Sequence, residues 1–595
     1  MSGKTLAFIL FLALAIALAF PASCPVAQRD IYLAAVTGEN TGGVFQLHVE
    51  VKPGSGSTYT SVNPRTGLST QESEDTAATY AFSSTGVDKR QCDVLLSMNG
   101  DFGGNSVDGP SAGGAMTAAM IAALTNRTIR QDVVMTGTIS PDGKVGAVGG
   151  IIEKGKGAAD AGAKYFITPK LMVHEAILLA ALSKNRDFHA IDVENLSQAE
   201  AILFSNYSAN FSSNFTPDSK PLPAGLPSLK MDADLGRFAL LSKKVVGELQ
   251  AKVAQAYPSG SDTPETSQLH SYFNKETAKY NSLIPMGYVF TAANSAFLLS
   301  IDVEYAKIGD ATVDLAGSIS DVKNCISSLP VANKTRENLH WAIGSDLRRI
   351  WATERLNQTL EARADQGGYT TLRDLLFSNS WCGISRGLAS QADDVGGEPV
   401  DESKLAPLAN KELLSAKEAF SGSKKSDYDA LWHLQNAEWA NSTGQYGASI
   451  YESAYARVMQ EAASGNIENV SDAAKRLSSE QRTSLWGKIY QGHGQYLYYD
   501  AQSGGFPPDD AYRIMAYAKE LDRVSSEMDA ALAAPSGSSE NAVPASAGQN
   551  AGKPQQSPWN AIAGQIATIA LALCLVAASL AVIHRFHRMK KRLVK

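Results

Sequence analysis

The chain has 595 residues, more than one compact domain usually holds, so two or three domains are expected. Hydrophobic residues make up 44% and charged residues 19% of the sequence, a balance that is typical of globular proteins. The formal net charge of -7 argues against nucleic acid as the main partner, because binding to phosphates needs a basic surface.

The chain begins with a segment that is typical of secretory signal peptides. Lys4 precedes the uncharged run Leu6–Phe20, which is short for a membrane-spanning helix, and small residues follow it. We therefore predict a signal peptide, or alternatively an uncleaved N-terminal anchor, over residues 1–27. Cys24 could be a lipoprotein cysteine, but Pro21 stands where that motif usually has Leu, so this alternative is less favoured.

The region from Ile31 to Phe204 predicts alternating strands and helices. Val44–Val51 alternates apolar and polar residues, as a half-buried strand does. Further strands are expected at Asp93–Met98, Asp132–Thr136 and Tyr165–Thr168, and helices at Thr70–Phe82, Ser111–Leu124, Ile151–Gly162 and from about Met172. This alternation predicts an α/β or α+β domain over residues 28–205.

A linker and a helical region are expected next. Residues 206–234 hold four prolines and three glycosylation sequons, a composition typical of a linker. Residues 235–533 predict a mostly α-helical domain, since apolar residues recur at helical spacing, first at Phe238, Leu241, Val245, Leu249 and Val253. The expected breaks lie at Pro258–Pro264, Gly367–Gly368, Gly396–Gly397 and Gly504–Pro508. We find no fixed repeat length and predict an irregular helical domain.

The C-terminal end predicts a membrane anchor. Residues 534–558 are rich in Pro, Ser, Gly, Asn and Gln, which predicts a flexible stalk. A transmembrane helix is expected over residues 559–584, because Ile562–Ile583 provides 22 residues without a charge. The basic tail, residues 585–595, is then cytoplasmic by the positive-inside bias. We expect a single-pass protein of the cell membrane with the bulk of the chain extracytoplasmic.

Sequons agree with an extracytoplasmic body, and cysteines are less decisive. Nine Asn-Xaa-Ser/Thr sequons occur, at Asn126, Asn195, Asn206, Asn210, Asn214, Asn333, Asn357, Asn441 and Asn469. Cys24 and Cys574 fall in the two predicted terminal segments. A Cys325–Cys382 disulfide is compatible with the sequence and would leave Cys92 free. No clustered Cys/His pattern indicates a metal site, and no cofactor is expected.

The stretch Asp108-Gly-Pro-Ser-Ala-Gly-Gly114 holds a candidate nucleophile. It places Ser111 at the head of a predicted helix, where free backbone N–H groups and the helix dipole favour negative charge. Such a place stabilises the oxyanion of acyl transfer, with the N–H groups of Ser111 and Gly109 as candidate donors. Gly113 and Gly114 are expected to let a substrate backbone approach. On local grounds alone, a simple helix cap explains Ser111 as well.

A lysine on the next predicted helix is the candidate base. Lys154 shares its helix face with apolar or small residues such as Ile151 and Ala158, and none of these neutralises an ammonium. Lys156 instead has Asp160 four residues on, as expected of an exposed pair. Desolvation would lower the pKa of Lys154, and only a neutral amine can accept a proton from serine. The alternative is a lysine that extends from the helix edge into water.

Taken together, three motifs resemble the proteolytic domain of Lon proteases, which are Ser–Lys peptidases. They are Asp108-Gly-Pro-Ser-Ala-Gly113, Met135-Thr-Gly137, and Gly149-Gly150 followed by Glu153-Lys154, and their order and spacing match the family. The resemblance covers roughly 30% of the chain. It implies that Ser111 is the nucleophile and Lys154 the general base. It also implies that the Thr136 hydroxyl helps to hold the lysine amine, with supporting roles for Asp108 and Gly109.

The chain departs from the family in one major respect. Lon proteases couple this domain to an ATPase, but no Gly-x-x-x-x-Gly-Lys-Ser/Thr phosphate loop occurs in the 595 residues. The acid that often follows the Met-Thr-Gly motif is replaced by Thr138. The chain is therefore more similar to archaeal secreted or membrane-anchored Lon-like proteins that lack the ATPase. The implied function is an ATP-independent serine endopeptidase that hydrolyses flexible or extended extracytoplasmic segments of protein or peptide substrates.

Other functions stay open beside this one. The chain could be a catalytically weak binding or scaffold protein of the cell surface, built on the helical domain, or a structural protein dominated by that domain and its glycans. Family members often form rings, so a homo-oligomer is compatible with the resemblance. His48 is predicted to be structural. Core positions rather than a ligand site are predicted for Trp341, Trp351, Trp432, Trp439 and Trp486.

Overall fold

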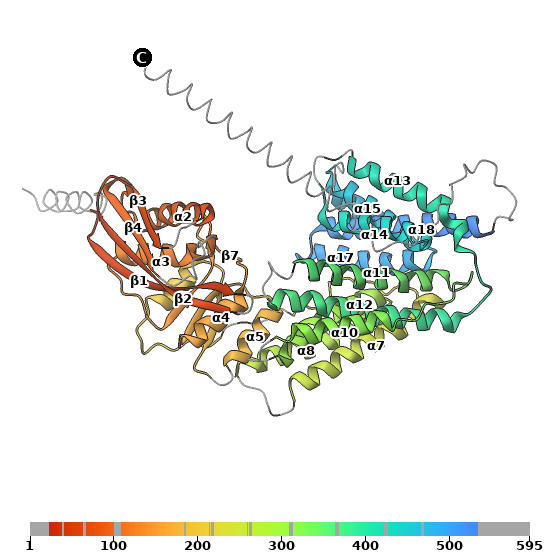
Figure 1. Cartoon of the computed structure of the whole chain (residues 1–595), viewed down its shortest axis with the longest axis horizontal. Coiled ribbons are helices and arrows are strands. Elements are labelled where there is room, and N and C mark those ends of the chain that lie inside the picture. The colour runs from red at the N-terminus through yellow and green to blue at the C-terminus, as the bar shows by residue number, and fades with distance from the viewer. Residues whose placement is uncertain are drawn as a thin grey trace, which may run out of the picture. The chain divides into compact units, whose positions relative to one another are not determined.

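The computed structural model describes residues 23–533, apart from residues 39–40, 64–66, 100–108, 184–185, 214, 216–218, 259, 261–263, 309–312, 363–367, 422, 424–425 and 466–468. A sheet with its helices is followed along the chain by a region of helices (Figure 1). The predicted stalk, membrane helix and tail, and the predicted signal segment up to residue 22, lie outside the described residues. Within the described residues, no helix combines the length and the apolar character that a membrane span requires.

The N-terminal part is built on a mixed seven-stranded sheet with the strand order β3-β4-β2-β1-β5-β8-β9. The strands are β1 (Ala27–Gly38), β2 (Thr41–Pro53), β3 (Thr58–Asn63), β4 (Cys92–Asn99), β5 (Val133–Met135), β8 (Tyr165–Pro169) and β9 (His189–Val193). β1 pairs antiparallel with β2 and parallel with β5, and the antiparallel pairs of this sheet are confined to β1, β2 and β4, since β3 pairs parallel with β4. β6 (Thr138–Ile139) and β7 (Val145–Gly146) form a separate hairpin.

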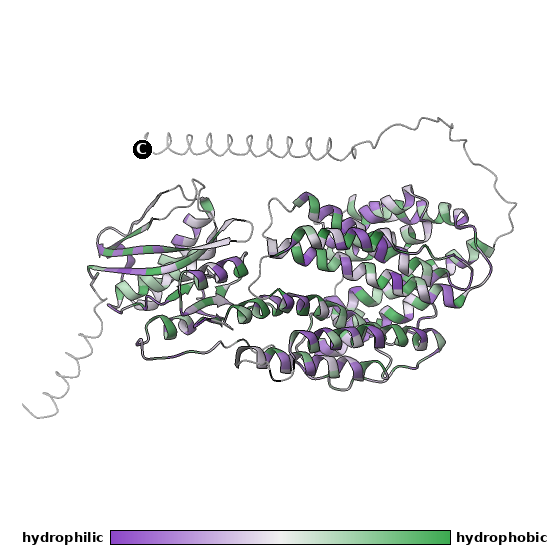
Figure 2. Cartoon of the chain, turned by 60° about the horizontal axis from the view of Figure 1, so that its bottom comes forward, coloured by the Kyte–Doolittle hydropathy of each residue, from purple (hydrophilic) through white to green (hydrophobic). Residues whose placement is uncertain are grey.

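Helices cover both faces of this sheet. α2 (Leu68–Thr85), α3 (Gly113–Leu124) and α6 (Leu196–Leu203) share a core with one face, and α4 (Ile151–Asp160) and α5 (Val173–Ser183) with the other. Side chains alternate between the two cores along β1, β5 and β8, so Leu33 lies in the first core and Ala34 in the second. Hydrophilic and hydrophobic residues also alternate visibly along the long strands (Figure 2). This layered arrangement confirms the predicted α/β fold.

The remainder is mostly helical, as predicted. Its elements are α7 (Ala233–Ala256), α8 (Pro264–Leu283), α9 (Val289–Glu304), η3 (Tyr305–Lys307), α10 (Leu315–Ser327), α11 (Leu339–Ala362), α12 (Gly368–Val395), η4 (Glu402–Leu405), α13 (Ala406–Ser421), α14 (Tyr428–Ser442), α15 (Tyr446–Ala463), α16 (Val470–Ser478), α17 (Leu485–Gln502) and α18 (Pro508–Ala533). The predicted proline and glycine breaks fall between these helices or at their ends. The predicted apolar face of α7 is buried. Consecutive helices such as α11 and α12, and α17 and α18, pack against each other.

The tryptophans of the helical part differ in their surroundings. Trp341 and Trp486 are buried, as predicted, and Trp351 and Trp432 are partly buried. The prediction that Trp439 lies in the core was wrong, because this residue in the last turn of α14 is 39% exposed.

Two disulfides join distant parts of the chain. Cys325 on α10 is bonded to Cys382 on α12, as the sequence allowed. The expectation that Cys92 would be free was wrong, because it is bonded to Cys24. The strand register explains this pair: Ala27 lies opposite Val51 near the end of β2, and Pro53 lies opposite Cys92. The segment before β1 therefore reaches the start of β4 across β2.

Candidate active site

Ser111 lies in a short turn, η2 (Pro110–Ala112), that leads directly into α3. Gly109 precedes the turn with a φ of 133°, a conformation that residues with side chains rarely adopt. Two hydroxyl groups of α2 hold this backbone. Thr70 donates to the Gly109 carbonyl and Ser73 to the Pro110 carbonyl, each at 3.2 Å. Ser111 therefore stands at the head of a buried helix, as predicted, on a turn that α2 holds in place.

Gly113 and Gly114 have a different role from the predicted one. Both are buried in the first turn of α3. A Cβ atom on Gly113 would lie 2.5 Å from the Ser73 hydroxyl oxygen, and one on Gly114 would lie 2.6 Å from Cε of Met135. The prediction that they make room for a substrate backbone was wrong, since the chain's own side chains occupy that space. These glycines let α3 pack closely against α2 and β5.

Lys154 lies in the first turn of α4, and only 4% of it is exposed. Burial lowers the pKa of Lys154 from 10.5 to about 8, against a smaller opposing effect of the Glu153 carboxylate. Among the described residues, no carboxylate forms an ion pair with the Lys154 amine. Near pH 8 the Lys154 amine is therefore neutral in a sizeable fraction of the protein molecules, and a general base must be neutral.

The neighbouring Lys156 lacks the partner that the sequence suggested. Asp160, four residues further on, pairs instead with Arg186 at 2.6 Å. Asp160 is the exposed last residue of α4, and Arg186 lies in the turn that follows α5. The predicted Lys156–Asp160 pair was therefore wrong, because a residue distant in sequence takes the carboxylate.

Two glycines set the position of α4 over the sheet. A Cβ atom on Gly157 of α4 would lie 2.5 Å from the carbonyl carbon of Gly42 on β2. A Cβ atom on Gly42 would lie 2.1 Å from the carbonyl oxygen of Glu153. The helix backbone thus lies directly against the strand backbone, a contact that the sequence analysis missed. This close packing places α4, which carries Lys154, directly against the sheet.

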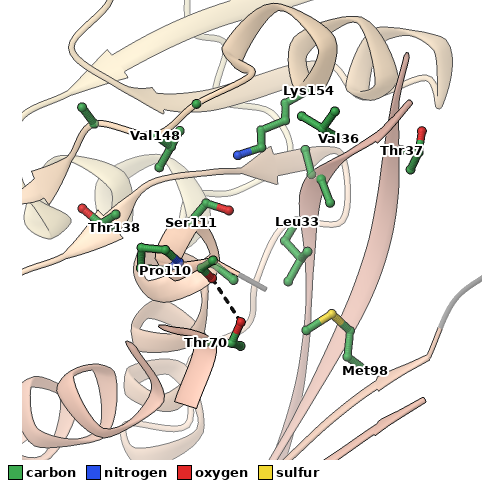
Figure 3. A pocket seen from close by; sticks show the side chains of 16 residues that line it. Leu33, Val36, Thr37, Thr70, Met98, Pro110, Ser111, Thr138, Val148 and Lys154 are labelled. Carbon is green, nitrogen blue, oxygen red and sulfur yellow. Dashed lines mark hydrogen bonds between the residues drawn. The ribbon is translucent and has the colours of Figure 1, made fainter. Parts of the chain in front are cut away.

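Ser111 and Lys154 line the same cleft, which has a volume of about 470 Å³. Figure 3 shows the two side chains reaching into it from different elements, Lys154 from α4 and Ser111 from the turn before α3. Residues Leu33 to Thr37 of β1 form another side, and Thr138 also lines the cleft. No hydrogen bond joins the Ser111 hydroxyl to the Lys154 amine in this part of the structure. The cleft thus contains a serine and a desolvated lysine.

Thr136 and Asp108 were predicted to support Lys154 and Ser111. Thr136 is fully buried, and its hydroxyl donates to the Ser111 carbonyl at 3.3 Å. The Gly137 N–H donates to the same carbonyl at 2.8 Å, so the Met-Thr-Gly motif holds the backbone of Ser111. The contact of Thr136 with the lysine amine stays a prediction. Asp108 lies outside the described residues.

The part of the chain that contains this cleft is similar in sequence to known peptidases. Residues 39–199 match the Lon protease (S16) C-terminal proteolytic domain. The chain is 30% identical over 200 residues to Lon protease 2 of Herpetosiphon aurantiacus, covering 33% of this chain and 24% of that protein. It is 33% identical over 147 residues to the Lon protease of Chloroflexus aggregans, which covers 24% and 18% of the two chains. The chain thus spans a quarter or less of the length of these relatives. At the family level, the match supports a serine peptidase.

Proposed function

We propose that this chain, which carries a Lon-type proteolytic domain in its N-terminal part, is an ATP-independent serine endopeptidase with Ser111 as nucleophile and Lys154 as general base. One observation carries the proposal: the two side chains line one cleft, and Lys154 is buried there without a carboxylate partner among the described residues. A buried, unpaired lysine is costly unless it is neutral, and a neutral amine beside a serine is a base beside a nucleophile.

The proposed reaction proceeds in two steps. Neutral Lys154 takes the proton of the Ser111 hydroxyl as its oxygen attacks the scissile carbonyl carbon. The oxyanion forms near the head of α3, where backbone N–H groups stabilise it. The Lys154 ammonium then gives its proton to the leaving amine, and an acyl-enzyme remains. Water, deprotonated by Lys154, attacks the ester and releases Ser111 and the carboxyl product. Thr136 and Asp108 are proposed to support the lysine and the Ser111 loop.

The proposed substrates are segments that are already extended. The 595 residues contain no phosphate-loop motif, so this chain by itself has no evident means to unfold a substrate with ATP. A cleft with one wall along β1 accepts only chain that can lie within it. Folded substrates would therefore be cut only in flexible segments.

The two disulfides support an extracytoplasmic location, which we also propose. Disulfides persist in oxidising compartments and are rare in the cytosol. The bond from Cys24 to Cys92 requires that any signal-peptide cleavage occur before Cys24 and not as late as residue 27. It also uses the thiol that a lipid anchor would need. We propose that residues 562–583 anchor the chain in the membrane.

Cleavage by matched variants of the full chain tests the proposed function. Ser111→Ala and Lys154→Ala should each lower hydrolysis of unstructured fluorogenic peptides by about a thousandfold or more. Lys156→Ala, a change of the neighbouring lysine on α4, should retain activity, and thermal unfolding should show that all three variants fold. Substantial cleavage by either dyad variant would refute the dyad. A requirement for ATP and Mg²⁺ would refute ATP independence.

A further inference from the structure

The helical part contains a second cavity, which we call the aromatic cavity. It measures about 280 Å³ and lies among α7, α9, α11, α12 and α17. Its walls include Phe297, Trp351, Trp381, Trp486 and Tyr490. Leu298, also in the wall, is 44% exposed, so the cavity reaches the surface. The volume lies near the lower limit of small-molecule sites, and the mostly apolar lining is typical of them.

A buried cation lies in the wall of this cavity. Arg348 is 6% exposed, and its guanidinium carbon lies 4.6 Å from the ring centre of Trp351 and 4.8 Å from that of Trp486. The guanidinium donates to the Gly344 carbonyl at a long 3.5 Å and contacts the Tyr490 hydroxyl. Cation–π contacts and these neutral partners offset only part of the cost of burying a charge. Arg348 has no carboxylate partner within ion-pair distance among the described residues.

A buried carboxylate, which lines a small neighbouring cavity together with Arg348, is bonded to other groups. Glu452 is 1% exposed and accepts hydrogen bonds from Nε1 of Trp351 and Nδ1 of His433, each at 2.6 Å. Among the described residues that line the aromatic cavity there is no Asp or Glu. Burial lowers the pKa of His493 in the wall to about 4, so this imidazole is neutral at neutral pH. His433, which also lines the cavity, is paired with Glu452, so among the described lining residues Arg348 is the charged side chain without a carboxylate partner.

We propose that the aromatic cavity binds a carboxylate with an apolar body. The carboxylate pairs with Arg348, which has spare N–H donors in the planar arrangement that carboxylates fit. The apolar body packs against the indole and phenyl rings of the walls. An organic cation, which aromatic walls alone would attract, is repelled by Arg348. A small aromatic acid and a peptide that ends in an apolar residue both provide this chemistry.

Binding to the full chain tests this proposal, with Ser111→Ala as the background so that no peptide is cleaved. Titration calorimetry compares 3-phenylpropionate with 3-phenylpropionamide, which has the same body without the charge. We expect saturable binding at one site, with the acid bound at least tenfold more tightly. Peptides that end in phenylalanine, with a free or an amidated carboxyl group, form the second arm. A charge-dependent preference in either arm supports the proposal and identifies the source of the carboxylate.

Three variants separate the parts of the site. Arg348→Gln should remove the preference for acid over amide. Leu298→Trp, at the exposed wall, should weaken both ligands severalfold even if Arg348→Gln does not fold. Leu414→Trp, a change of a leucine on α13 that is 59% exposed and outside the cavity lining, should change neither. No saturable binding, equal affinity for acid and amide in both arms, or an unchanged preference in Arg348→Gln would overturn the proposal. None of these measurements depends on whether Ser111 is catalytic.

Discussion

Lys154 is a basic side chain in a place where its charged form is unfavourable. An exposed lysine is protonated at neutral pH and cannot act as a base, whereas the buried Lys154 has a pKa near 8. Its helix positions indicated this burial, since Ile151 and Ala158 on the same face are buried as expected. The sequence did not indicate that Asp160 pairs with Arg186 and not with Lys156, because Arg186 lies in a different element.

The pH dependence of peptide hydrolysis should follow this pKa. Protonated Lys154 cannot accept the Ser111 proton, so kcat/KM should rise with pH through an inflection near 8. At pH 7 the rate should be roughly tenfold below its plateau, because one pKa unit changes the neutral fraction about tenfold. Steady-state kinetics between pH 6 and 10 measure the profile.

A control variant tests whether the inflection near pH 8 belongs to Lys154. Lys156→Ala removes the adjacent lysine of α4 and should leave the inflection in place. A rate that is independent of pH between 7 and 9, or an inflection near the ordinary histidine pKa of about 6.5, would show that another group is the base.

At the scale of elements, close packing at glycines positions the helices that border the cleft. Gly42 and Gly157 bring α4 against β2, and Gly113 and Gly114 bring α3 against α2 and β5. A local sequence pattern shows that a glycine is present but not which distant residue faces it. The sequence motifs therefore predicted which helices border the cleft. They did not predict why these helices contain glycine, because that depends on contacts with segments distant in sequence.

Gly157→Ala should impair the site through the position of α4. The added methyl group cannot fit 2.5 Å from the Gly42 backbone, so the helix must shift and carry Lys154 with it. We expect a loss of about 1–3 kcal/mol in the free energy of unfolding and at least a tenfold lower kcat. Urea unfolding and peptide hydrolysis measure the two effects.

Gly247→Ala is the matched control for this variant. Gly247 lies within α7, where a Cβ atom would meet nothing within 4 Å, so alanine should leave stability unchanged or raise it by up to about 1 kcal/mol. Normal activity and stability of Gly157→Ala would contradict the proposed packing constraint.

At the scale of the whole molecule, the α/β part and the helical part were predictable from periodicity and from prolines and glycines. β1 was missed as an element because its apolar residues do not alternate: the strand is buried on both faces, with Leu33 in one core and Ala34 in the other. The Cys24–Cys92 bond was missed because Cys24 was assigned to the signal segment. The aromatic cavity was not predictable, since its walls come from helices that are distant in sequence.

Glycan mapping should test the proposed extracytoplasmic location. The exposed Asn206, Asn333 and Asn357 should carry glycans when the protein is isolated from its own host. Asn195 should not, because its side chain caps α6 by accepting from the Gln198 N–H at 3.1 Å. Mass spectrometry of glycopeptides measures occupancy. Full occupancy at Asn195 with none at the three exposed sites would contradict this accessibility argument.

Loss of the Cys24–Cys92 disulfide should lower the free energy of unfolding. Replacing both Cys24 and Cys92 by Ser should cost about 2–4 kcal/mol, because the bond restricts the unfolded chain over a separation of 68 residues. Non-reducing peptide mapping should recover a linked fragment that contains both cysteines, and denaturant unfolding gives the energy. Free thiols at both positions in the isolated protein would contradict the bond.

The pairing of these cysteines also bears on how the chain could mature. Cys24 is bonded to Cys92 and Cys325 to Cys382, so the two loops follow one another and do not interleave. A chain that crosses a membrane with its N-terminus first would expose the cysteines in the order in which they pair. Each thiol would meet its native partner before the next pair emerged, so an oxidase acting on the emerging chain would form both native bonds without an isomerase to correct them.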